Sequence, residues 1–236
     1  METYIIDADN IDGDLFFYNL TRNSNDFSML PVFELDHIAQ KIRNILKKHG
    51  SRKDIILNHR ELQEAFFSPF KPQLKNAQVF LSHSHADINK ALEVKNYLEN
   101  QIKRKVFIDS LFWDYKDDVL NKLAKYDDIS RIEDAFTLIL RESLEYMIKK
   151  CPYFVFLQSK NSVSNQGLSQ ITYSAWIYEE LRIANTFIAD TTIKESHIKA
   201  MRISYDITNL LRRFKPISLN GLCKKIAFNL ITKDAK

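Results

Sequence analysis

Glycine is scarce in this sequence, with only four among 236 residues. The four stand far apart, at Gly13, Gly50, Gly167 and Gly221. Phosphate-binding loops of the G-x-G-x-x-G and P-loop types need several glycines close together, so that the backbone can approach a phosphate. Neither loop can be drawn here, and a bound nucleotide would have to be held in some other way.

Features of secreted, membrane and nucleic-acid-binding proteins are also absent. The N-terminal residues are acidic and unlike a signal peptide, and no apolar run approaches the ~20 residues of a membrane span. The net charge is only +4, and Lys and Arg are interleaved with Asp and Glu. The two cysteines, Cys151 and Cys223, have apolar neighbours, as buried reduced thiols would. We therefore expect a soluble cytoplasmic protein that binds neither membrane nor nucleic acid.

The N-terminal third of the sequence is predicted to be mainly helical. Residues 1–76 show no strand-like alternation, while the spacing of apolar residues predicts helices over 33–49 and 59–67. Pro69 and Pro72 follow the second helix and mark a boundary. We therefore expect a small, mainly helical N-terminal extension over residues 1–76 and a main domain over residues 77–236.

The main domain alternates strands and helices. Short apolar runs predict strands at 78–82, 105–109 and 153–157. Amphipathic patterns predict helices that start near 87 and near 172, and others over 117–126, 131–150 and 219–231. A strand, a helix and a strand in succession imply parallel pairing. The fold class is therefore α/β, an open parallel sheet with flanking helices, a long helical insert around 112–150 and a polar loop over 159–170.

Three segments of the main domain resemble the TIR (Toll/interleukin-1 receptor) domain family, and together they fall within residues 78–187. Residues 79–87 (VFLSHSHAD) resemble its opening strand, and residues 106–110 (VFIDS) the strand that leads to its BB loop. Residues 174–181 (SAWIYEEL) resemble its Trp-x-x-x-Glu helix. The insert from 112 to 141 is longer than in animal and plant TIR domains. With its run Trp113–Asp118 it resembles bacterial TIR-like proteins of the Thoeris type, which make signals in antiphage defence.

The resemblance implies an enzyme, an NAD glycohydrolase or ADP-ribosyl cyclase that uses NAD as its substrate and needs no cofactor. Nicotinamide leaves NAD as a neutral base, so one carboxylate can serve where glycosidases need two. That residue would be Glu180, which shares a helix face with Trp176, whereas Glu179 should face solvent. The alternative reading of Glu180 is a solvated helix residue near Arg182. The product would be an ADP-ribose-derived signal, cyclic or conjugated, sensed by a separate effector protein.

Other substrate-binding candidates follow the strands, because ligands of open α/β sheets lie beyond the carboxyl ends. Core packing is the alternative for the aromatic candidates, and a capping role is the alternative for Asp109. The full set of candidates is Phe80, Ser82, His83, Ser84, Asp109, Trp113 and Trp176.

The resemblance also implies self-association through the loop after the second strand, here residues 110–115, with the apolar Leu111, Phe112 and Trp113. Packing of Phe112 and Trp113 under the insert helices is the alternative. A non-catalytic TIR adaptor that acts only by self-association is the alternative for the whole chain.

The spacing His83-x-His85-x-Asp87 admits a second chemistry. It resembles the metal motif of metallo-β-lactamase-fold hydrolases, but that motif continues with histidine where this chain has Ile88. His197 is the only histidine left downstream, although two imidazoles and a carboxylate could in principle hold zinc. We expect no metal.

Overall fold

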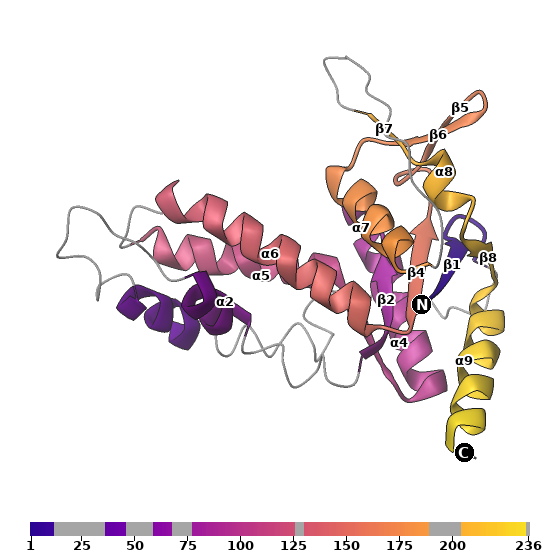
Figure 1. Cartoon of the computed structure of the whole chain (residues 1–236), viewed down its shortest axis with the longest axis horizontal. Helices are drawn as coiled ribbons and strands as arrows, with labels where there is room; N and C mark the ends of the chain where they lie inside the picture. The colour runs from indigo at the N-terminus through magenta and orange to yellow at the C-terminus, as the bar shows by residue number, and fades with distance from the viewer. Residues whose placement is uncertain (12–35, 46–58, 68–76, 126–129, 189–203, 235–236) are drawn as a thin grey trace. The chain divides into compact units, whose positions relative to one another are not determined.

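The structure, a computed structural model, describes residues 1–11, 36–45, 59–67, 77–125, 130–188 and 204–234 (Figure 1). Two compact units divide the chain. Unit 1 consists of Met1–Leu20, Ala77–Ile108 and Met147–Lys236, and unit 2 of Thr21–Asn76 and Asp109–Tyr146. The N-terminal segment and the insert thus cluster together in unit 2, apart from the first 20 residues.

Unit 1 is built on an open five-stranded parallel sheet, which confirms the predicted α/β fold. The strands lie in the order β3-β2-β4-β1-β8 and all pair in parallel. Every residue of β4 except Gln158 is buried, as expected for a central strand covered on both faces. The bounds are β1 Glu2–Asp7, β2 Ala77–Ser82, β3 Lys105–Ile108, β4 Tyr153–Gln158 and β8 Lys215–Pro216.

The expectation of no strand before residue 77 was wrong. Strand β1 pairs with β4 along its whole length, from Glu2 opposite Tyr153 to Asp7 opposite Gln158, and its other edge pairs with β8. Its run of Thr, Tyr and two Ile suits a strand buried between two neighbours. Tyr4 and Ile6 are almost completely buried, so these first residues belong to the core of the sheet.

The predicted helices of unit 1 are present. After the short 3-10 turn η2 (His85–Asp87), α4 (Ile88–Ile102) connects β2 to β3 and packs beside α9 (Leu219–Asp234). α7 (Ala175–Thr186) follows β4 and contacts the short helix α8 (Thr208–Leu211). Nowhere in the described ranges is a helix both long and apolar enough to cross a membrane.

Two predicted loops contain regular structure. Residues 110–115 are not a loop, because α5 (Asp109–Leu123) begins immediately after β3. The predicted polar loop over 159–170 contains the strands β5 (Ser164–Gln166) and β6 (Ser169–Thr172). They pair antiparallel around Gly167, whose φ of 61° suits glycine in a tight turn. β7 (Tyr205–Asp206) completes a small three-stranded sheet.

Unit 2 is helical in its described parts. It contains a helix over 36–45, α2 (His59–Phe67), α5 and most of α6 (Ser130–Lys150). Phe66 packs edge-to-face on Phe136 at 5.1 Å between ring centroids, which joins α2 to α6. The rest of the helix predicted over 33–49 lies outside the described residues.

Candidate functional site

Glu180 is completely buried and is held by a hydrogen bond. Its side chain has an exposed fraction of 0%, and its Oε2 accepts a hydrogen bond from the hydroxyl of Ser82. Ser82 ends β2 and is equally buried, so the bond ties α7 to the carboxyl end of a central strand. The reading of Glu180 as a solvated residue was wrong, because its side chain is fully buried. Arg182 forms an ion pair with Glu179 at 3.3 Å.

Helix α7, which carries Glu180, is fixed at both ends. At its start the Ser174 hydroxyl accepts a hydrogen bond from the Ile177 amide at 3.3 Å. At its end the buried Asn185 amide group donates to the carbonyls of Leu181 at 2.8 Å and Leu210 at 3.3 Å. These contacts set the height and rotation of α7, and therefore the place of the Glu180 carboxylate.

The residues around Ser82 differ in exposure. His83 is buried at 4% exposed, Ser84 is half-buried, and His85 faces solvent. Asp87, the last residue of the H-x-H-x-D motif, is buried and accepts hydrogen bonds from the side chains of Ser159 and Asn161. Among the residues that the structure describes, no three His, Cys, Asp or Glu side chains are grouped so that they could hold a metal ion.

Phe80 is packed in the core of the sheet. It is 0% exposed, and its ring lies 5.3 Å from that of Phe154, nearly parallel, and 5.4 Å from that of Phe107. These contacts favour the core-packing alternative, and a role in stacking on the substrate stays a prediction. Trp176 is half-buried on the first turn of α7, one turn before Glu180.

The remaining two candidates lie on α5. Asp109 is its first residue and Trp113 stands in its second turn. Both side chains lie outside the described residues, and both positions belong to unit 2. The candidates that the structure brings together are therefore Ser82 and Glu180, with His83 next along the chain.

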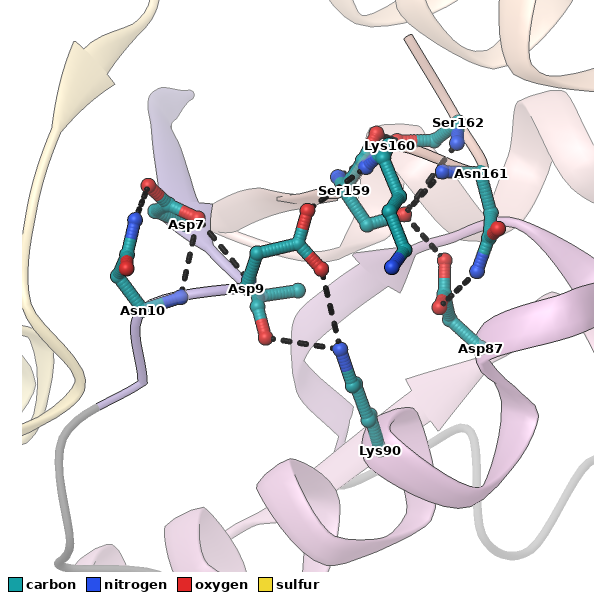
Figure 2. Close-up of polar contacts among 10 residues, drawn as sticks. Asp7, Asp9, Asn10, Asp87, Lys90, Ser159, Lys160, Asn161 and Ser162 are labelled. Carbon is teal, nitrogen blue, oxygen red and sulfur yellow. Dashed lines mark hydrogen bonds and ion pairs between the residues drawn. The ribbon is translucent and has the colours of Figure 1, made fainter.

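A second polar cluster, which was not predicted from the sequence, lies at the same carboxyl ends of the strands (Figure 2). Asp87 accepts hydrogen bonds from the hydroxyl of Ser159 and from the side-chain amide of Asn161, the latter at 2.8 Å. Ser159 directly follows β4, and Asp87 ends the 3-10 turn after β2. Asp87 and Ser159 are both buried, so these bonds join the ends of the two strands in the protein interior.

The end of β1 is joined to the same loops. The Asp9 carboxylate accepts a hydrogen bond from the Lys160 amide at 2.8 Å and forms an ion pair with the Lys90 ammonium at 3.2 Å (Figure 2). The Lys160 amide, and secondarily Lys90, lower the pKa of Asp9. Asp7 accepts from the amides of Asp9 and Asn10, which closes the turn after the strand. The run D-A-D-N after T-Y-I-I is the sequence signal that could have revealed both the strand and this turn.

Both clusters lie where ligands of such sheets are expected. The chain leaves β2 towards β3 on one side and leaves β4 towards β8 on the other, so the two neighbouring strands form a topological switch point. Ligands of open α/β sheets bind beyond the carboxyl ends of the strands at such a point. Ser82 ends β2, Asp87 follows it and Ser159 follows β4, so the switch point is rich in buried polar groups.

The Asp87 bonds predict a measurable contribution to stability. Replacing Asp87 with alanine leaves the Ser159 hydroxyl and the Asn161 amide without their buried acceptor, and we expect the free energy of unfolding to fall by about 2–3 kcal/mol. Asp9→Ala removes contacts of a carboxylate that is 35% exposed, and should cost less than about 1 kcal/mol. Urea unfolding of both variants measures the difference, and equal losses would contradict this assignment.

Both cysteines are buried free thiols, as expected. Burial raises the pKa of the Cys151 thiol to about 12 and that of Cys223 to about 11, so neither is a reactive thiolate at neutral pH.

Comparisons of the chain with protein-family models, with curated proteins and with solved structures find no match.

Proposed function

We propose that this protein is a TIR-type enzyme that cleaves the nicotinamide–ribose bond of NAD with Glu180 as the catalytic carboxylate. One observation carries the proposal: the Glu180 carboxylate is buried on α7 and bonded to Ser82 at the carboxyl end of β2. Glu180 and Ser82 come from two of the three segments that resemble the TIR family. Residues 98 positions apart in sequence thus meet at the topological switch point.

The strand order supports the proposal. Counted from β2, where the resemblance begins, the order β3-β2-β4 is 2-1-3, as in a flavodoxin-like sheet. The next position in the sheet is taken by β1, which comes from the N-terminus rather than from the segment after α7. The fold is thus a flavodoxin-like arrangement in which the N-terminal residues supply the fourth strand.

The chemistry needs a single carboxylate. When the bond between ribose and the pyridinium nitrogen breaks, its electron pair goes to the nitrogen and nicotinamide leaves neutral, without a proton. The positive charge moves to the ribose as an oxocarbenium ion, which a carboxylate in a dry site stabilises. Water then attacks the cation to give ADP-ribose and a proton. Alternatively, a nucleophilic atom elsewhere in the same ADP-ribosyl cation attacks it and gives a cyclic product.

The complete burial of Glu180 has two consequences. In the enzymatic proposal, NAD must displace the side chains that cover the carboxylate before it can react. The same burial favours a second candidate, a non-catalytic module in which Glu180 fastens α7 to the sheet through Ser82. The two candidates differ in what happens to NAD.

Purified protein incubated with NAD should release nicotinamide together with ADP-ribose or an isomer of cyclic ADP-ribose, identified by mass spectrometry. The incubation is run over a wide range of protein concentrations, because self-association implies activity that rises faster than linearly with concentration. Intact NAD at every concentration, with circular dichroism showing folded protein, would support the non-catalytic module and overturn the enzymatic proposal.

A further inference from the structure

The geometry points to Ser82 as a positioning residue that orients the Glu180 carboxylate, and not as a residue that contacts the substrate. This inference rests on the proposed function. Both side chains are buried: Ser82 and Glu180 are each 0% exposed, and the Ser82 hydroxyl donates to Glu180 Oε2. A hydroxyl that is covered and already donates to the carboxylate is committed to that partner.

Ser82 is a rigid support for this bond. β2 pairs with β3 on one side and β4 on the other, and Ser82 lies opposite Phe156 in the register with β4. A residue in an interior strand is fixed more firmly than a residue on a loop. The paired strands therefore hold the donor in one place.

The acceptor needs such a support. A glutamate side chain turns about three bonds, and a helix fixes only the first of its atoms. The contacts of Ser174 and Asn185 fix α7, and the Ser82 bond then fixes Oε2 at the end of the side chain. With Oε2 fixed, the direction of Oε1 is set as well, because the carboxylate is planar. In a mechanism that relies on one carboxylate, its orientation towards the ribose decides the rate.

The test compares steady-state NAD cleavage by Ser82→Ala with the unaltered protein. Loss of the hydroxyl should lower kcat about 10- to 100-fold and change KM less than about twofold, because orientation is lost and substrate contacts are kept. Ser82→Thr keeps a hydroxyl and suits a strand, and should restore most of kcat. Ser82→Cys, with a similar size and a weaker donor, should fall between them.

Ser143→Ala is the matched control. Ser143 is also a buried serine, but its hydroxyl donates to the Ile139 carbonyl within α6, so both kinetic constants should stay unchanged. Thermal unfolding verifies that each variant is folded.

The outcomes separate the inference from the proposed function. A rise in KM with unchanged kcat would mean that Ser82 contacts NAD, and a rise in kcat would mean that its bond holds Glu180 away from the substrate. Either result, or unaltered kinetics of Ser82→Ala beside an inactive Glu180→Gln, overturns the positioning role alone. Absence of NAD cleavage by the unaltered protein overturns the proposed function, and the inference with it.

Discussion

Glu180→Gln is expected to abolish NAD cleavage and leave the fold intact. Glutamine has nearly the same shape as glutamate and can still accept a hydrogen bond from Ser82, so α7 should remain tied to β2. The amide carries no negative charge, however, and cannot stabilise the oxocarbenium ion. Loss of such an electrostatic group lowers kcat by about 100- to 1,000-fold. Nicotinamide release measured by chromatography gives kcat, and circular dichroism checks the fold.

Glu179→Gln is the control for this variant. Glu179 precedes Glu180 on the same helix, lies on a different face and pairs with Arg182. The expectation that Glu179 faces solvent was wrong, because its side chain is only 15% exposed and is held by this ion pair. We expect NAD cleavage within about twofold of the unaltered protein. An inactive Glu179 variant beside an active Glu180 variant would show that the catalytic carboxylate has been assigned to the wrong helix face.

The sheet could be predicted only where the sequence carries a local signal. β2, β3 and β4 are short apolar runs bounded by polar residues, and the order of elements then implies parallel pairing. β1 carries a similar local signal, T-Y-I-I followed by D-A-D-N, but its partners β4 and β8 lie far away in the sequence, so its place in the sheet could not be predicted. Pairing over such distances is decided by the packed core, which local patterns do not describe.

The candidate site, like the sheet, could be predicted only in part from local patterns. The 3.6-residue period of α7 places Glu180 on the face of Ile177 and Leu181, both of which are buried. That its carboxylate bonds to Ser82 depends on the approach of α7 to the end of β2, which no local pattern specifies. The Asp87–Ser159 bond likewise joins residues 72 positions apart. Only the first turns of α5 were missed, because Leu111, Phe112 and Trp113 suggested an apolar loop that mediates self-association, whereas the helix begins at Asp109.

Phe80→Ala is expected to lower the free energy of unfolding by about 3–5 kcal/mol, the usual cost of removing a large aromatic ring from a core. Phe80 is completely buried, lies nearly parallel to Phe154 at 5.3 Å and contacts Phe107 at 5.4 Å. Phe154 in turn packs edge-to-face on Phe214 at 5.5 Å. Truncation would leave a cavity between β2, β3, β4 and the residues directly before β8. The paired strands cannot move together to fill it. Urea unfolding measures the loss.

Phe228→Ala serves as the matched control, since Phe228 on α9 is 64% exposed and its truncation should change stability by less than about 0.5 kcal/mol.

A separate variant distinguishes packing from substrate stacking. Phe80→Leu keeps most of the buried volume but has no aromatic ring, so a core role predicts a KM for NAD that is unchanged within about twofold. A role in stacking on nicotinamide or adenine predicts instead a KM raised by tenfold or more, about 1.4 kcal/mol of lost binding, with little loss of stability. A large change in KM with Phe80→Leu, together with a stable Phe80→Ala variant, would contradict the assignment of this ring to the core.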